Sequence, residues 1–125
     1  MRLEQEATQF LKEKYSMSDF NAYQRMAATT AIYPEEHRIL YPALGLAGEA
    51  GEVANKVKKL IRDGPDGRPD DWREQIASEI GDVLWYCASL ATDLNLTLGM
   101  IASQNEKKLA MRKKAGTIGG SGDTR

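Results

Sequence analysis

The chain has 125 residues, of which 42% are hydrophobic and 28% are charged, as expected for one soluble globular domain. Its formal net charge of −1 provides no basic field that would attract nucleic acid. The first residues lack an apolar leader, and no segment reaches the roughly 18 apolar residues of a membrane span. Cys87 is the single cysteine and has no second cysteine to pair with. We therefore expect a cytoplasmic protein.

Apolar residues recur at helical spacing along the chain, and no strand is indicated. We expect a helical N-terminal extension over 1–17, a helical bundle domain over 18–114 and a flexible glycine-rich tail over 115–125. Within the bundle domain, the helices are expected at about 18–30, 43–62, 71–94 and 97–114. Several polar residues are suited to cap these helices, namely Ser18 or Asp19, Asp70 or Asp71, and Thr97. Pro42 suits the first turn of the second one.

Short connections favour an all-α antiparallel bundle of four to five helices. The helix at 71–94 has the widest apolar face, made of Ile76, Ile80, Val83, Leu84, Cys87, Leu90, Ala91 and Leu94. We expect this face to be buried, with Cys87 as a small core residue. A bundle of this size is expected to cover part of such a surface by forming a homodimer or homotetramer.

Two pairs of acids stand out in these helices. Glu49 and Glu52 are three residues apart, as are Glu79 and Asp82, so each pair lies on one side of its helix. Four carboxylates facing one another across a helix pair repel unless cations neutralise them. Oxygen ligands without cysteine or histidine favour Mg²⁺, or Mn²⁺, over zinc. A di-iron centre usually needs Glu-x-x-His motifs, and the single histidine, His37, lies in a predicted loop.

A solvated helix face is the alternative explanation for the first acid pair. An ion pair between Glu52 and Lys56 would contribute about 0.3 to 0.5 kcal/mol to such a face. Two features favour a site instead. Glu79 and Asp82 border the most apolar stretch, where carboxylates are costly unless neutralised. Glycines that cost about 0.5 to 1 kcal/mol each accompany the acids and allow close approach of a helix or a ligand: Gly45, Gly48, Gly51 and Gly81.

The last predicted helix carries a second polar stripe. Asn105, Lys108 and Arg112 share one face, where a neutral donor and two cations can hold a polyphosphate. Mg²⁺ commonly shares its shell with substrate phosphates, so the combination indicates phosphate-ester chemistry. A solvated basic helix end is the alternative for this stripe. Lys56 and Lys59 could add phosphate contacts or could be surface charges.

The full pattern, Glu49-Ala-Gly-Glu52 followed by Glu79-Ile-Gly-Asp82, resembles that of the MazG-like family of all-α nucleoside triphosphate pyrophosphohydrolases. The surrounding segments YPALGLAGEAGEVANKVKKLIRDG and NEKKLAMR…GSGDTR also resemble the small single-domain members. The resemblance extends over about residues 20–125.

The resemblance implies Mg²⁺-dependent cleavage of a (d)NTP between its α and β phosphates, giving a monophosphate and pyrophosphate, in nucleotide-pool control or house-cleaning. It also implies dimers or tetramers whose sites use neighbouring chains. Asn105 and Lys108 match the family's phosphate contacts, and Arg112 fits the same role. The family's metal ligands match four acids of this chain: Glu49, Glu52, Glu79 and Asp82.

Several assignments stay open at this point. Either Glu49 or Glu52 could accept the proton of the attacking water. The base-binding residues are not assigned, because each aromatic candidate could instead be a core residue: Tyr23, Trp72, Trp85 and Tyr86. The tail could fold over a nucleotide as a lid. A non-catalytic helical oligomerisation module and a nucleotide-binding sensor are the alternative functions.

Overall fold

The computed structural model describes residues 19–124. This part of the chain holds four α-helices and one short 3₁₀ helix and contains no strand, which confirms the all-α prediction. The elements in chain order are α2 (Phe20–Ala28), η1 (Glu35–His37), α3 (Leu40–Gly67), α4 (Trp72–Asp93) and α5 (Leu98–Ala115). None of these helices is long and apolar enough to cross a membrane. The helical extension predicted at 1–17 lies outside the described residues.

Two of the predicted caps form as expected. The side chain of Asp19 accepts a hydrogen bond from the N–H of Ala22, and that of Thr97 accepts one from Met100. Asp71 occupies the N-cap position of α4, but its carboxylate accepts a hydrogen bond from the side chain of Gln75, 2.9 Å away, rather than from a backbone N–H. The starts of α2 and α5 are therefore fixed by local sequence, as predicted.

Helix α3 is longer at both ends than its predicted range of 43–62. It begins at Leu40, so Pro42 falls in the first turn, as expected. Near the other end, Gly64 adopts φ 70° and ψ 179°, which kinks the helix before Pro65. A residue before proline is disfavoured in the helical region, and glycine tolerates this alternative conformation. The regular part of α3 thus ends close to where the sequence predicts.

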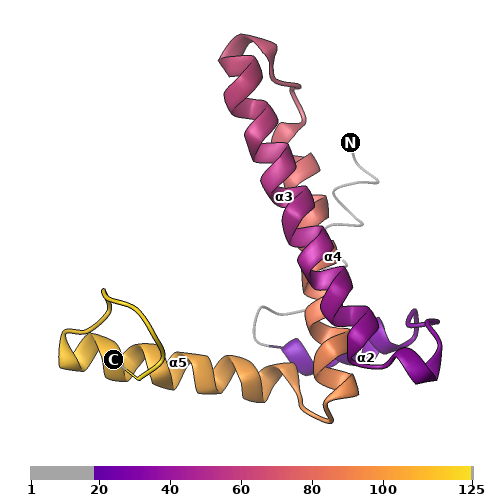
Figure 1. Cartoon of the computed structure of the whole chain (residues 1–125), viewed down its shortest axis with the longest axis vertical. Coiled ribbons are helices and arrows are strands. Elements are labelled where there is room, and N and C mark those ends of the chain that lie inside the picture. Colours follow the sequence, from indigo (N-terminus) through magenta and orange to yellow (C-terminus); the bar gives the residue numbers. More distant parts are fainter. Residues whose placement is uncertain (1–18, 125) are drawn as a thin grey trace.

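The helices α3 and α4 run antiparallel, side by side, and form one long hairpin (Figure 1). At its base, α2 packs against α4. Helix α5 departs from the predicted bundle because it projects away from the hairpin (Figure 1) and contacts α2 and α4 only weakly. The turn before it contains Asn95 in a left-handed conformation, with φ 57°, which redirects the chain after α4.

A small core holds the base of the hairpin together. Its buried apolar residues are Ala27, Ala88, Ala91 and Leu98, and Tyr23, Trp85 and Cys87 pack against them. The buried Gln24 side chain spans this junction: it donates to Thr92 Oγ1 and to the Leu96 carbonyl and accepts from the Leu98 N–H. The start of α5 is therefore fixed, although the rest of the helix extends outward. Burial raises the pKa of the half-buried Cys87 thiol.

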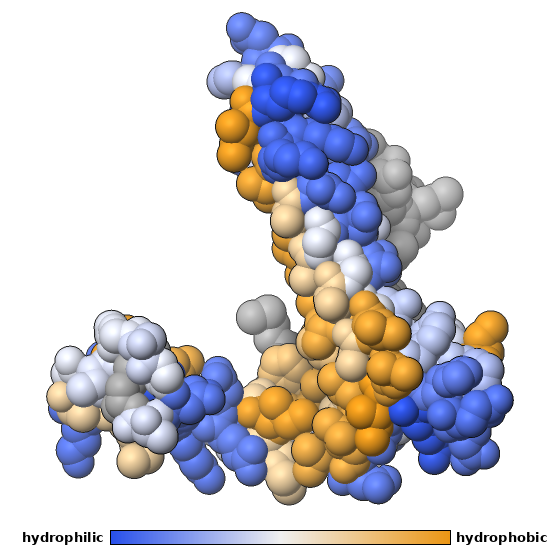
Figure 2. Space-filling view, viewed as in Figure 1, coloured by the Kyte–Doolittle hydropathy of each residue, from blue (hydrophilic) through white to orange (hydrophobic). Residues whose placement is uncertain are grey.

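Much of the predicted apolar face of α4 is not buried in the single chain. Ile80 is 53% exposed and Leu94 is 45% exposed. On α3, Leu44 is 65% exposed and Ile61 is 80% exposed. Figure 2 shows apolar surface over the lower part of the hairpin and its base. The prediction that the α4 face is buried is wrong at Ile80, Leu84 and Leu94, because α3, the one long helix that lies alongside α4 among residues 19–124, does not cover the whole apolar face.

Candidate metal and phosphate site

An acid cluster lies where α3 and α4 face each other. Helix α3 supplies Glu49, and α4 supplies Glu79 and Asp82. One carboxylate oxygen from each of these residues lies within 4.8 Å of the other two. Glu49 and Glu79 are half-buried, whereas Asp82 is exposed. The antiparallel contact of two helices thus gathers three of the four predicted metal ligands.

The fourth predicted ligand, Glu52, is not in this group. It lies on α3 almost one turn after Glu49 and is exposed. Three residues turn an α-helix by about 300°, so the two side chains point about 60° apart around its axis. Glu52 is still near enough for its charge to help raise the pKa of Glu49. We describe Glu49, Glu79 and Asp82 as the acid triad below.

The acid triad is electrostatically unfavourable for a metal-free chain. Partial burial, followed by the charges of Asp82 and Glu79, raises the pKa of Glu49 above its ordinary value of 4.5. The triad offers only carboxylate oxygens, which suit Mg²⁺ or Mn²⁺. In an octahedral Mg²⁺ shell the oxygens lie about 3 to 4 Å apart. The spacing and donor type therefore fit one hard divalent cation with small side-chain adjustments.

Tyr86, one turn after Asp82 on α4, packs directly against the backbone of α3 beside this cluster. A Cβ atom at Gly45 would lie only 2.1 Å from the Tyr86 ring, so the close approach requires glycine at that position. By contrast, a Cβ at Gly48, Gly51 or Gly81 would meet none of the described residues within 4 Å. The predicted close approach is therefore made at Gly45, whereas the other three glycines are not approached closely by any described residue.

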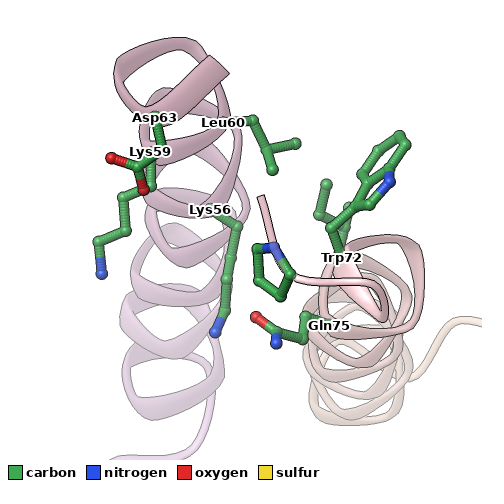
Figure 3. A pocket seen from close by; sticks show the side chains of 8 residues that line it. Lys56, Lys59, Leu60, Asp63, Trp72 and Gln75 are labelled. Carbon is green, nitrogen blue, oxygen red and sulfur yellow. The ribbon is translucent and has the colours of Figure 1, made fainter. Parts of the chain in front are cut away.

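Lys56 and Lys59 lie further along α3 and line a small cavity of about 150 Å³ at the loop end of the hairpin. Figure 3 shows Lys56 between the two helices, with Trp72 and Gln75 on the α4 side. The guanidinium groups of Arg68 and Arg73 lie 5.0 and 5.2 Å from the centroid of the Trp72 ring. This end of the hairpin is thus rich in cations, and its indole is already in contact with two of them.

The other predicted phosphate contacts lie on α5. Asn105, Lys108 and Arg112 are carried by the part of this helix that projects away from the hairpin (Figure 1), so one chain does not bring them to the acid triad. Lys108 and Arg112 instead contact Asp123 of the tail, at 3.3 and 3.0 Å. Arg112 is only 7% exposed.

Known proteins resemble this chain in sequence. Residues 39–117 match the family model described as the MazG nucleotide pyrophosphohydrolase domain. This chain belongs to the MazG nucleotide pyrophosphohydrolase family. It is also similar to the Gene 37 protein of Mycobacterium phage L5, with 44% identity over 109 residues, which cover 82% of this chain and 96% of the phage protein. No solved structure gives a significant match.

The region matched to the MazG family, 39–117, contains the acid triad and the polar stripe of α5, and it stops before Asp123. The sequence analysis predicts only that the tail could form a lid, and the pairing of Asp123 with Lys108 and Arg112 is not predicted. The sequence does contain a signal for this pairing. The cationic end of α5 is followed by a glycine-rich segment that can reverse direction, and then by the acid Asp123.

Asp93 is a second residue whose role in this MazG-family chain was not predicted. Its carboxylate accepts hydrogen bonds from the Tyr33 hydroxyl at 2.8 Å and from the Ile39 N–H at 2.9 Å. Burial, followed by the hydrogen bond and charge of Asp93, raises the pKa of Tyr33 to about 12. Ile39 has φ 67°, so Asp93 anchors a strained residue at the start of α3. This anchor positions the helix that carries Glu49.

Two of the aromatic candidates for base stacking are engaged in the fold. Tyr23 packs against the small core. Trp85 also packs there and donates from its indole nitrogen to Thr30 Oγ1 at 2.8 Å. Its ring meets that of Tyr86 edge-on, with centroids 5.0 Å apart. These contacts favour the core interpretation for Tyr23 and Trp85.

Proposed function

We propose that this MazG-family chain is an Mg²⁺-dependent nucleoside triphosphate pyrophosphohydrolase. It cleaves a (d)NTP between the α and β phosphates, releases a monophosphate and pyrophosphate, and serves nucleotide-pool control in the cytoplasm. The observation that carries the proposal is the acid triad, in which oxygens of Glu49, Glu79 and Asp82 lie within 4.8 Å of one another. Family membership supports the reaction class.

The triad residues hold the divalent cation, with Mn²⁺ as the alternative to Mg²⁺. When bound, the cation supplies positive charge to phosphate oxygens and assists activation of a water nucleophile. Glu79 and Asp82 approach from α4, and Glu49 approaches from α3, so the hairpin fixes the triad from two sides. Glu52 can complete the ligand set by a change of its exposed side chain.

Glu49 is the first candidate for the group that takes the proton from the attacking water. Glu49 is half-buried, and one of its carboxylate oxygens lies within 4.8 Å of oxygens of Glu79 and Asp82, so it can reach a water beside the cation. Glu52, which is exposed and lies outside the triad, is the second candidate. Either carboxylate would act within reach of the cation that the other acids hold.

Phosphate contacts come from two sources in this proposal. Lys56 and Lys59 lie on the same hairpin as the triad. Asn105, Lys108 and Arg112 are contributed by α5 of a second copy, in a homodimer or homotetramer. The supporting observations are the projection of α5 away from its own hairpin and the exposed apolar residues of α3 and α4.

The proposal is tested by incubating the purified protein with a panel of (d)NTPs and Mg²⁺ and identifying the products. We expect equal amounts of nucleoside monophosphate and pyrophosphate from at least one nucleotide, and loss of the activity with a chelator. Release of orthophosphate and nucleoside diphosphate would contradict the proposed cleavage position. Absence of turnover across the whole panel would reject the enzymatic function and leave a binding module or sensor.

A further inference from the structure

The glycine-rich tail folds back over the second half of α5. Gly116 ends the helix in the left-handed conformation, with φ 71°. Gly120 and Gly122 also have positive φ values, 93° and 83°, which allow the chain to reverse direction. The reversal brings Asp123 onto the helix it follows. The tail over 116–124 is called the strap below.

Asp123 pairs with the two cations predicted to bind phosphate. Its carboxylate accepts hydrogen bonds from Lys108 Nζ at 3.3 Å and from Arg112 Nη2 at 3.0 Å. Arg112 also donates to the Gly122 carbonyl at 3.4 Å. The hydrogen bonds from Arg112 and then Lys108 lower the pKa of Asp123, so the carboxylate is ionised at neutral pH. The side chain of Asp123 is 82% exposed, whereas that of Arg112 is 8% exposed.

These contacts border a pocket of about 560 Å³ between α5 and the strap. Apolar surface makes up most of its lining, to which Met111 and Ala115 contribute, and its polar residues are Gln104, Lys107, Lys108, Arg112, Thr117, Asp123 and Thr124. Two buried polar atoms in this lining, Arg112 Nε and Thr117 Oγ1, have no hydrogen-bond partner among the described residues. A buried guanidinium needs an anion, and the two oxygens of one carboxylate leave part of this donor set unused.

We propose that this pocket binds the polyphosphate of the substrate and that Asp123 occupies it in the resting chain as an internal competitor. A polyphosphate carries more charge and more acceptor oxygens than one carboxylate, so it displaces Asp123 and satisfies the remaining donors. A single phosphate gains less and competes poorly. The strap therefore lowers affinity for all anions and selects for chains of phosphates. The identity of the anion as a nucleotide polyphosphate rests on the proposed function.

The test measures binding of inorganic tripolyphosphate by calorimetry, without Mg²⁺, to the native chain and to Asp123→Asn. We expect the variant to bind about two- to fivefold more tightly, the range of an exposed ion pair. Asp70→Asn removes one negative charge from an exposed loop position and should bind as the native chain does. Unchanged or weaker binding by Asp123→Asn would overturn the proposal.

Two further variants test the pairing itself. Asp123→Glu keeps the charge and should retain an affinity within about twofold of the native value. Adding Lys108→Met to Asp123→Asn should remove the gain, and a gain that persists would show that the anion binds elsewhere. Because tripolyphosphate binding requires no hydrolysis, these results stand apart from the nucleotide panel. Competition by Asp123 can be confirmed even if no nucleotide is hydrolysed, and hydrolysis can be confirmed even if Asp123 does not compete.

Discussion

The α3–α4 hairpin and helix α5 carry the two halves of the predicted chemistry in very different settings. In the hairpin, two long helices lie against each other, and oxygens of Glu49, Glu79 and Asp82 lie within 4.8 Å of one another in a single chain. Among the described residues, helix α5 is held to the other helices near its start, where Asn21 accepts a hydrogen bond from the N–H of Gly99. Its cations contact the chain's own tail through Asp123.

The contrast shows that contacts within one chain are enough to form the acid triad but do not bring the α5 stripe to it. Acids on two contacting antiparallel helices come together within one chain where the helices face each other, as Glu49, Glu79 and Asp82 do, whereas Glu52 stays outside the group. Among residues 19–124, no long helix lies alongside the stripe on α5, and in the proposed oligomer a second chain would bring this stripe to the triad. Substitutions in the hairpin should therefore affect the site of the same chain, whereas substitutions on α5 should, if the proposed oligomer forms, affect the site of a second chain.

Removing a triad carboxylate is expected to give the largest effect. Glu79→Gln keeps the size of the side chain and removes one charged oxygen ligand, so turnover should fall by at least about 100-fold. Pyrophosphate release under saturating Mg²⁺ measures this loss. Glu74→Gln, an exposed acid in the first turn of the same helix, is the matched control and should keep native turnover. Native turnover by both variants would show that Glu79 is not needed for catalysis.

A methyl group added at Gly45 should destabilise the hairpin. Its Cβ would lie 2.1 Å from the Tyr86 ring, so Gly45→Ala is expected to lower the free energy of unfolding by about 1 to 3 kcal/mol. Gly48→Ala meets nothing within 4 Å and should be neutral, or stabilising by up to about 1 kcal/mol through helix propensity. Denaturant unfolding of both variants gives the comparison, and equal losses would contradict the observed packing.

Lys108→Met should act on substrate binding, raising KM about tenfold with little change in thermal stability, because the side chain is exposed.

Co-expression of Lys108→Met with Glu79→Gln tests whether a second chain supplies α5. If each site of a dimer uses the triad of one chain and α5 of the other, a mixed dimer has one site in which both parts are intact. Random pairing makes half of the dimers mixed, so about a quarter of the native activity should be measured. If each site used one chain alone, the Lys108→Met half of the chains would be active at about one tenth of the native rate at low substrate concentration. The mixture would then show about one twentieth of the native activity.

The pH dependence of stability is expected to give the smallest effect. Because the pKa of Glu49 is raised in the folded chain, the folded state binds more protons than the unfolded state just above pH 4.5. The free energy of unfolding of the metal-free protein should therefore fall as pH rises through this window. Mg²⁺ should reverse the loss near neutral pH. Unfolding curves at several pH values measure both effects, and Glu49→Gln should flatten the dependence.

The sequence predicts the hairpin well because its signals are local. Apolar periodicity and helix caps place α4 within a residue or two of its observed bounds, and the acid spacing identifies all three members of the triad. The exposure of Glu52 was not predicted, because the alignment of two helices, rather than spacing on one, decides which acid of a pair points inward. The same applies to Asp93, whose bond to Tyr33 joins residues 60 positions apart.

The direction of α5 was harder to predict from its own sequence. Its start is correctly marked by Thr97, yet its path depends on the left-handed Asn95 and on the bridge made by buried Gln24. Neither feature has a periodic signature. The exposure of Ile80 was missed for a related reason, since an apolar stripe does not reveal whether its cover comes from the same chain.

The central claim is that the acid triad holds the divalent cation, and titration of Mg²⁺ into the metal-free protein by calorimetry tests it most directly. The account predicts saturable binding by the native chain and by Glu74→Gln, and loss of that binding in Glu79→Gln. Equal Mg²⁺ binding by native protein and Glu79→Gln, or no binding by the native protein, would contradict it.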